Sequence, residues 1–221
     1  FFEELLAEPS EGTIAYRGAK RFTQVAKPHA LTQEPVKWRM GETYMITGGF
    51  GGIGATVARE MLAEGANVVL QSRAALPDRE NWDKIKAFRA ASDPLARRVR
   101  LAEDLEKLPG QLMVVAADVC NLDDMQRAVR EVDARFGKIN GVVHAAGVIN
   151  DGPMLAKSSV DVADVMAPKL HGTLVLDQLF ADGDLNWLVL FSSTSTVTTP
   201  AGQVDYVAAN EFLNAYAAAC K

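Results

Sequence analysis

The pattern that most limits the fold of this chain begins at Thr43. From there, short runs rich in Val, Ile and Leu alternate with segments whose apolar residues recur at helical spacing. This alternation is typical of βαβ units, in which helices join consecutive parallel strands and cover the sheet. It predicts a Rossmann-like α/β fold with a doubly wound parallel sheet. The predicted strands cover residues 44–47, 67–71, 112–116, 141–144 and 187–191, and the predicted helices cover residues 52–64, 121–136, 161–180 and 205–219.

Two segments depart from this alternation. Residues 1–40 contain two short strand-like runs on either side of Gly18, which we interpret as a hairpin or a remnant of a sheet, followed by a linker. Residues 79–108 are charged and weakly periodic, so we expect one or two solvated surface helices there that carry no chemistry. The chain is therefore divided into residues 1–40 and a sheet-forming region over residues 41–221.

Composition argues against several classes of protein. The 23 Lys and Arg residues face 28 Asp and Glu residues, giving a net charge of −5 with both signs scattered, so a basic nucleic-acid-binding patch is not expected. The sequence has no apolar run long enough to span a membrane and no cationic leader before a hydrophobic segment. Cys120 and Cys220 stand far apart and the histidines form no metal-spaced pair, so we expect no metal site and a reducing, cytoplasmic compartment.

A glycine-rich loop follows the first predicted strand and opens the first predicted helix, which is the setting that a dinucleotide site requires. Glycines permit a tight turn and a close approach of the backbone to a pyrophosphate, and the helix N-terminus offers free N–H groups to the phosphates. A merely tight turn can use the same residues, but the position at the head of the sheet favours cofactor binding. The candidate residues of this loop are Thr47, Gly48, Gly49, Phe50, Gly51, Gly52, Ile53 and Gly54.

Three further strand ends are expected at the same pocket, because ligands of open α/β sheets collect at the carboxyl ends of the strands. The second strand ends in Ser72 and Arg73 where an NAD site would carry a carboxylate, and a cation there suits a 2′-phosphate, so NADP(H) is preferred. A carboxylate at the third strand end is placed to accept from an adenine amino group, and small residues at the fourth leave room for the cofactor. These residues are Asp118 and Val119, and Ala145, Ala146 and Gly147.

The fifth predicted strand is followed by Ser193, which stands 13 residues ahead of Tyr206. This arrangement resembles the short-chain dehydrogenase/reductase superfamily, in which a lysine usually stands four residues after the tyrosine; here that residue is Asn210. The ketoreductase domains of modular polyketide synthases are similar to the superfamily but exchange the lysine and asparagine positions, with the lysine 24 residues before the serine. That position here is Lys169. The resemblance spans nearly the whole chain, and residues 1–40 resemble the end of the structural subdomain that precedes the catalytic half.

The resemblance implies an enzyme that uses NADPH to reduce a carrier-protein-bound β-ketoacyl thioester to the β-hydroxyacyl thioester during polyketide assembly. Tyr206 would donate the proton to the developing alkoxide, and Ser193 would hydrogen-bond the carbonyl oxygen. Lys169 would tune Tyr206 and hold the nicotinamide ribose, while Asn210 would position a water or Tyr206. The implied partners are an acyl carrier protein and neighbouring synthase domains.

Asn150 and Asp151 are candidate stereocontrol residues. The run Ile149 to Asp151 resembles the Leu-Asp-Asp pattern of the ketoreductases called B-type, although Asn150 departs from it. The tryptophan that marks the opposite type, eight residues before the tyrosine, is replaced by Thr198, and Thr199 replaces a glycine common in that loop. The resemblance therefore favours a D-hydroxy product.

Two other interpretations remain open: a non-catalytic reductase-like scaffold domain of a megasynthase, and a free-standing short-chain reductase. The presence of all four candidate catalytic residues argues against the first, and the exchanged Lys169 and Asn210 argue against the second. The family pattern also predicts a sixth strand and a substrate-covering lid after Lys221. We therefore expect the 221 residues to be cut at both ends, and the fragment alone to be unstable or inactive.

Overall fold

The computed structural model describes residues 4, 6, 14–25, 27–28, 30, 38–181, 183 and 185–220. The chain falls into two compact units, Phe1–Val36 and Lys37–Lys221.

In the first unit, β1 (Ile14–Arg17) and β2 (Lys20–Thr23) pair antiparallel, with Gly18 in the turn at a φ of +59°, so the expected hairpin is confirmed. Arg21 of this hairpin forms an ion pair of 2.6 Å with Glu4.

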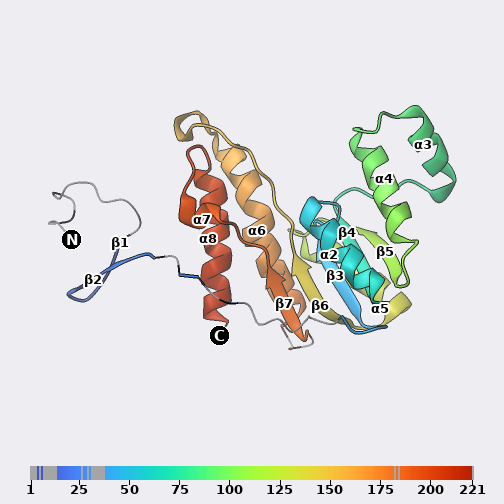
Figure 1. Cartoon of the computed structure of the whole chain (residues 1–221), viewed down its shortest axis with the longest axis horizontal. Helices are drawn as coiled ribbons and strands as arrows, with labels where there is room; N and C mark the ends of the chain where they lie inside the picture. Colours follow the sequence, from blue (N-terminus) through green and yellow to red (C-terminus); the bar gives the residue numbers. More distant parts are fainter. Residues whose placement is uncertain are drawn as a thin grey trace. The chain divides into compact units, whose positions relative to one another are not determined.

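The second unit is built on one parallel sheet of five strands in the order β5-β4-β3-β6-β7 (Figure 1). The chain lays down β3, β4 and β5 towards one edge and then returns to place β6 on the other side of β3. Thr47, the last residue of β3, therefore pairs with Gln71 of β4 on one side and His144 of β6 on the other. This reversal opens a crevice at the carboxyl ends of the strands and confirms the predicted fold class. The strands are β3 (Thr43–Thr47), β4 (Asn67–Ser72), β5 (Gln111–Ala116), β6 (Ile139–His144) and β7 (Trp187–Leu190).

Helices cover both faces of the sheet. On one face, α2 (Gly52–Ala63) and α4 (Pro94–Leu105) pack onto Ile46, Val68 and Leu70. On the other, α5 (Leu122–Phe136) and α6 (Ser159–Leu179) pack onto Met45 and Val142. Adjacent residues of β3 thus enter opposite cores, as a strand that is buried on both faces requires.

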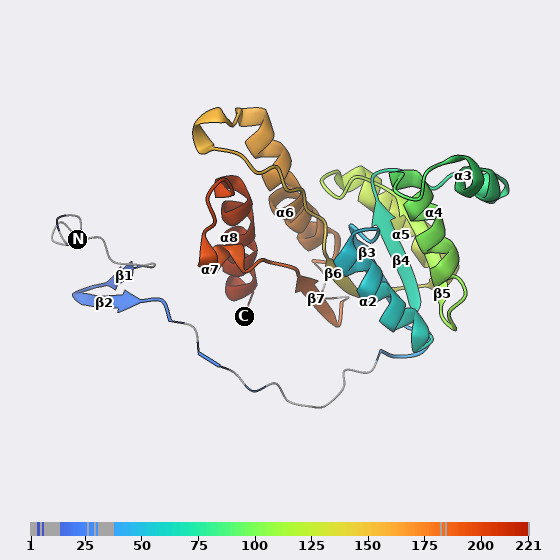
Figure 2. The same cartoon turned by 45° about the horizontal axis from the view of Figure 1, so that its top comes forward.

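The last helix, α8 (Val204–Ala219), packs beside α6 near β7 (Figures 1 and 2). Pro168 lies inside α6, and its backbone carbonyl oxygen is within hydrogen-bond distance of the His144 side chain in β6. The short elements are η1 (Arg79–Asn81), α3 (Trp82–Phe88), η2 (Met154–Ala156) and α7 (Ser195–Thr198).

The charged segment before β5 differs from the prediction. It does form helices, α3 and α4, but Ala96, Val99, Ala102 and Leu105 of α4 are fully buried. This segment therefore contributes side chains to the core as well as to the solvated surface. The helix is held in place at its start, where Asp93 accepts hydrogen bonds from two backbone N–H groups and Pro94 occupies the first turn.

The helix starts differ in whether a side chain caps them. Asn121 caps α5, and Ser158 with Asp161 forms a capping box at α6. The glycine loop leads into α2 through Gly51, with no side-chain cap and no acidic residue in the first turn. The orphan N–H groups of α2 are therefore left for another acceptor.

Within the described part of the chain, no helix combines the length and apolarity that crossing a membrane requires. The same residues contain no group of three or more His, Cys, Asp or Glu side chains arranged to hold a metal ion.

Candidate functional site

A cavity of about 690 Å³ opens at the carboxyl ends of β3, β4, β5 and β6. Ten of the fifteen predicted cofactor-binding residues line it: Gly48, Phe50, Gly51, Ser72, Arg73, Asp118, Val119, Ala145, Ala146 and Gly147. The other five, Thr47, Gly49, Gly52, Ile53 and Gly54, belong to the glycine loop and its flanks but do not line this cavity.

Two glycines of the loop are required by close backbone packing. Gly48 has a φ of +65°, and a Cβ on it would stand 2.8 Å from the Cα of Ala146. A Cβ on Gly54 would stand 2.9 Å from the Cα of Gly49. Gly52, in contrast, has open space at its Cβ position, and the side chain of Ile53 is half exposed. The loop is thus shaped by Gly48 and Gly54, and it leaves free room beside Gly52.

His144 ties the loop to α6. Its Nε2 lies 3.0 Å from the carbonyl oxygen of Pro168, which only accepts, so Nε2 carries the proton and donates. Its Nδ1 therefore accepts from the Thr47 hydroxyl at 2.7 Å, and that hydroxyl oxygen accepts in turn from the Ala146 N–H at 3.3 Å. Burial, together with the nearby charge of Lys169, lowers the pKa of His144 to about 4, so the ring is neutral. His144 is thus a structural link between β3, β6 and α6.

One end of the cavity carries two cations. Arg73, at the end of β4, is exposed there, and Arg98 reaches the same place from α4. The Arg98 guanidinium stacks 4.6 Å from the Phe50 ring and donates to the hydroxyl of Ser72 at 2.9 Å and to the carbonyl of Ala74. Its Nε is buried with no partner among the described residues. Sequence reasoning missed Arg98, because it lies in the segment expected to carry no chemistry.

Asp118 lies at the end of β5 and lines the cavity. Its Oδ1 accepts from the backbone N–H of Cys120 at 2.9 Å, which fixes the carboxylate against the turn that follows the strand. The neighbouring Val119 is 4% exposed and joins the core. The turn that follows β5 therefore fixes the orientation of the Asp118 carboxylate.

Next to the cavity, Lys169 and Tyr206 come together from the facing helices α6 and α8. Neither residue lines the cavity itself, but Lys169 follows directly after Pro168, which does. The Lys169 Nζ lies 5.9 Å from the centroid of the Tyr206 ring and donates to the carbonyl oxygen of Phe191 at 2.8 Å. A Cβ on Gly147 would lie 3.3 Å from the Lys169 side chain, so the ammonium stands beside the end of β6. Lys169 is only 4% exposed, and burial lowers its pKa to about 8.

Asn210 is fully buried one helical turn after Tyr206. Its Nδ2 donates to the backbone carbonyl of Tyr206 at 2.7 Å, and the backbone carbonyl of Asn210 accepts from the hydroxyl of Ser192 at 3.2 Å. Its Oδ1 has no hydrogen-bond partner among the described residues. A buried acceptor without a donor is costly, so this atom marks a place that suits a water or another donor.

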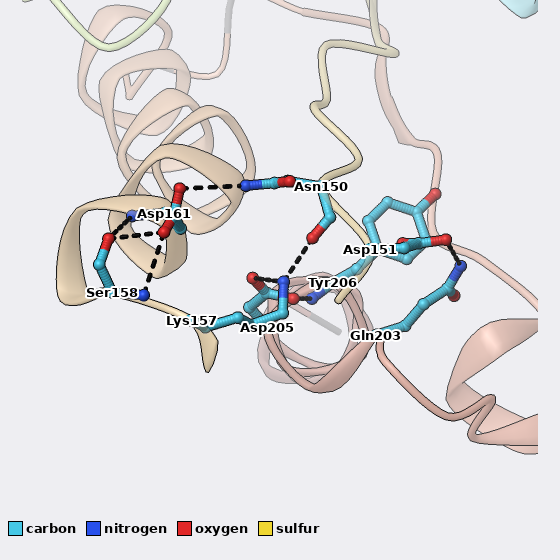
Figure 3. A network of polar contacts seen from close by, with 8 residues as sticks. All are labelled: Asn150, Asp151, Lys157, Ser158, Asp161, Gln203, Asp205 and Tyr206. Carbon is cyan, nitrogen blue, oxygen red and sulfur yellow. Dashed lines mark hydrogen bonds and ion pairs between the residues drawn. The ribbon is translucent and has the colours of Figure 1, made fainter. Parts of the chain in front are cut away.

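Ser193 belongs to a chain of polar side chains. Its hydroxyl donates to that of Ser195 at 3.1 Å, and Ser195 donates to the Oε1 of Gln203 at 2.9 Å. The Nε2 of Gln203 then donates to Asp151 at 2.9 Å (Figure 3). The candidate serine and the candidate stereocontrol aspartate are thus linked through Gln203, a residue that spacing alone did not single out.

The two candidate stereocontrol residues point in different directions (Figure 3). Asp151 turns towards Gln203, whereas the Asn150 amide turns to Asp161 of the α6 capping box, with Nδ2 3.2 Å from Oδ1. This contact gives a physical reason for the departure at Asn150, because an aspartate there would set two carboxylates together.

The turn after α7 is strained. Thr199 is the one described residue other than glycine with a positive φ, +41°, and it adopts the left-handed conformation. A β-branched residue there costs roughly 1–2 kcal/mol. This is the position at which the family pattern has a glycine.

Comparison with known proteins shows the family to which the chain is similar. The model of the family called the KR domain matches residues 42–221. The chain is 34% identical over 98% of its length to "5-methyl-1-naphthoate synthase" of Streptomyces sahachiroi, and 32% identical over 96% to "Polyketide synthase PksM" of Bacillus subtilis (strain 168). It spans only 12% of the first protein and 5% of the second.

Solved structures resemble the chain at similar identity. A ketoreductase domain from the bacillaene assembly line is 29% identical with a TM-score of 0.71, over 92% of this chain and 45% of that one. A structure of A-type ketoreductases from a modular polyketide synthase is 31% identical with a TM-score of 0.70, over 92% and 40% respectively.

Proposed function

This chain belongs to the KR domain family, the ketoreductase domains of polyketide synthases within the short-chain dehydrogenase/reductase superfamily, and on that premise we propose its substrate, cofactor and partner. The substrate is a β-ketoacyl thioester carried by an acyl carrier protein, the product is the β-hydroxyacyl thioester, and the reductant is NADPH. The observation that carries the proposal is the position of Lys169 against the Tyr206 ring, beside Gly147 of the cavity that the glycine loop opens.

The lining of the cavity fits a 2′-phosphorylated dinucleotide. Gly48 and Gly51 present bare backbone beside the uncapped start of α2, where a pyrophosphate is favoured. Arg73 and Arg98 supply two positive charges at the adenosine end, which is what a 2′-phosphate requires. Lys169, beside Gly147, would hold the nicotinamide ribose.

When bound, the reduced nicotinamide supplies a hydride to the β-carbon of the substrate. As the carbonyl π pair moves onto oxygen, the Tyr206 hydroxyl gives its proton to that oxygen and the product becomes a neutral alcohol. The Ser193 hydroxyl, which donates to Ser195 in the structure, would turn its proton to the same oxygen and stabilise the charge as it forms. Solvent then returns a proton to Tyr206.

Lys169 and Asn210 act through Tyr206. The Lys169 cation stabilises the negative charge that Tyr206 acquires when its proton leaves, and its buried position strengthens that interaction. Asn210 fixes the Tyr206 backbone through the carbonyl of that residue, and its unpartnered Oδ1 would bind a water at the end of the site.

The neighbouring synthase domains and the carrier protein are proposed partners, because the chain is similar to small parts of long synthases. The product is proposed to be the D-hydroxy thioester, from the Asp151 pattern and the absence of tryptophan at Thr198. Chiral chromatography of the product tests this, and a mainly L-hydroxy product would overturn it.

The test of the function is Tyr206→Phe, assayed with NADPH and a β-keto thioester. Removal of the proton donor should lower kcat/KM by about 10²- to 10⁴-fold while NADPH still binds. The matched control is Tyr216→Phe on the same helix, whose hydroxyl contacts Asp177 and not the cavity, and which should keep its activity. Undiminished reduction by a folded Tyr206→Phe protein would sink the assignment.

A further inference from the structure

A buried ion pair fastens the loop of residues 150–157 to the start of α8 (Figure 3). The Lys157 Nζ and the Asp205 Oδ2 are 2.8 Å apart, and the two side chains are only 5% and 1% exposed. The partners are 48 residues apart in the sequence. None of the roles assigned above uses this pair.

Each partner of the pair also contacts a residue of the proposed site. The Lys157 ammonium donates to the backbone carbonyl of Asn150, and the Asp205 Oδ1 accepts from the backbone N–H of Tyr206 at 2.9 Å. The two charges therefore form one continuous connection from the backbone of the candidate stereocontrol loop to the backbone of the candidate proton donor.

Two weaker contacts run alongside it. The Gly152 N–H donates to the carbonyl of Gly202 at 3.0 Å, and Gln203 donates to the Asp151 carboxylate at 2.9 Å. Without the ion pair, these two contacts and the exposed hydrogen bond from Asn150 to Asp161 would be left to hold the 150–157 loop among the described residues. The loop otherwise exposes large apolar side chains, Leu155 and Met154, and so has little burial of its own.

Stability alone does not explain a pair of this kind. The cost of removing two charges from water is close to the attraction that they gain, and apolar residues of similar volume are often as stable or more stable. A charged pair with further directional hydrogen bonds does, however, define one geometry, whereas apolar side chains tolerate several. The pair is thus suited to fixing a position.

We propose that Lys157 and Asp205 are positioning residues that hold the 150–157 loop at a fixed place relative to Tyr206, and so determine which face of the ketone is reduced. This inference rests on the proposed function. The candidate stereocontrol residue Asp151 lies on the same loop and accepts a hydrogen bond from Gln203, so a shift of the loop moves Asp151 relative to Tyr206. Such a shift would change the space in which the two ketone substituents must be distinguished.

The experiment replaces both charges together, as Lys157→Met with Asp205→Leu, in the intact protein. The ratio of the two hydroxy enantiomers is measured by chiral chromatography with NADPH and a β-keto thioester, next to thermal unfolding. We expect the ratio to fall by about tenfold or more towards a mixture, and kcat/KM to fall by about 10- to 100-fold, since small displacements of reacting groups have effects of this size. NADPH affinity should stay within about twofold, because the pair lies outside the cavity lining.

Two further variants make the result specific. Lys86→Met with Glu103→Leu removes an ion pair of 2.6 Å between α3 and α4, away from Tyr206, and should leave the enantiomer ratio unchanged. Asp205→Asn removes the charge but keeps an oxygen for the Tyr206 N–H, and it should give a smaller change of the same sign. A single removal that leaves a buried charge unpaired can cost roughly 3–5 kcal/mol, so the double variant is the primary test.

An unchanged enantiomer ratio in the folded double variant overturns the inference while leaving the proposed function intact. If that variant does not fold, an unchanged ratio in Asp205→Asn overturns it. A wild-type protein that reduces no β-keto thioester overturns the proposed function, and the inference with it.

Discussion

The cofactor cavity and the reactive residues next to it form two ends of the candidate site, and they are held in position by different physical means. At the cofactor end, which we define by Gly48, Gly51 and Arg73, position comes mainly from the backbone: strand ends set by pairing register, and a glycine that touches the next strand. At the reactive end, defined by Lys169, Ser193, Tyr206 and Asn210, position comes from side-chain hydrogen bonds and buried charge. The buried side chains of Lys169, Asp205 and Lys157, which carry formal charges, belong to this end or adjoin it.

This difference has a consequence for substitution. Backbone packing fails only when a side chain is added where none fits, whereas a polar network fails when any member loses its partner. The cofactor end should therefore tolerate most substitutions outside Gly48, Gly49 and Gly54, where an added Cβ would stand less than 3.0 Å from another atom. The reactive end should be sensitive at many positions, including residues that touch neither substrate nor cofactor.

After Tyr206→Phe, the largest expected effect is again at the reactive end, for Lys169→Met. A unit charge at about 6 Å and an effective dielectric of about 20 contributes roughly 3 kcal/mol, so its loss should lower kcat/KM by about 100-fold. Steady-state kinetics with NADPH measures this. A fall of less than about threefold would mean that the reactive end does not depend on this buried charge.

The same residue predicts a pH profile. Since burial lowers the pKa of Lys169 to about 8, the ammonium is lost as the pH rises above that value, and kcat/KM should decline there. Lys169→Arg keeps its charge throughout the range and should remove the decline, even if its overall rate is lower. A decline that persists unchanged in that variant would assign it to another group.

The next effect concerns the backbone packing of the cofactor end. Gly48→Ala places a Cβ 2.8 Å from a backbone atom at a positive φ, so it should destabilise the fold by about 2 kcal/mol or more. Chemical denaturation without cofactor measures this. Gly52→Ala is the control, since its Cβ meets open space within a helix, and it should change the free energy of unfolding by less than about 1 kcal/mol, in the stabilising direction.

His144 joins the two ends, and its effect should appear on acidification. Its pKa in the folded protein, about 4, lies below the ordinary value of 6.5, so the unfolded chain binds the proton more readily between these values. Stability from this group is present above pH 6.5 and is lost as the pH falls towards 4, by about 2 kcal/mol between pH 7 and pH 5. Urea unfolding at both pH values should show this loss.

The matched pair for that measurement is His144→Asn and His171→Asn. The second histidine is exposed on α6, so its replacement should leave the acid loss in place. Replacement of His144 should remove about 2 kcal/mol of it, whatever the stability at pH 7. An equal acid loss in both variants would contradict the structural role of His144.

The smallest expected effect is at the cofactor end, for Arg98→Met. Arg98 is the exception to the rule that the backbone positions this end, because its side chain reaches the cavity from α4. Arg98→Met keeps an apolar stem on Phe50 but removes the charge, and the dissociation constant for NADPH should rise by about tenfold while that for NADH changes little. Arg127→Met, at an exposed ion pair on α5, is the control. Equal weakening for both cofactors would show that Arg98 supports the loop rather than the phosphate.

Much of the fold could be predicted from local pattern. Periodicity predicted every strand of the parallel sheet and the helices α2, α5, α6 and α8 to within two residues at either end. The central strands β3, β4 and β6 are almost wholly buried, which requires continuous apolar runs. Residues 82–105 were harder, since their charged residues outnumber the apolar ones that α4 buries. Periodicity there was masked by arginines such as Arg98, whose stem and head have different surroundings.

The sequence by itself determined the α/β class, the glycine loop and the family resemblance, which the family match over residues 42–221 confirms. These are local features, since helical and strand periods and motif spacings are written along the chain. Only the tertiary structure decided that Arg98 reaches the cavity, that Gln203 joins Ser195 to Asp151, and that Lys157 meets Asp205. Such pairs are brought together by the path of the chain around the sheet, and neither partner's neighbours in the sequence record where the other one lies.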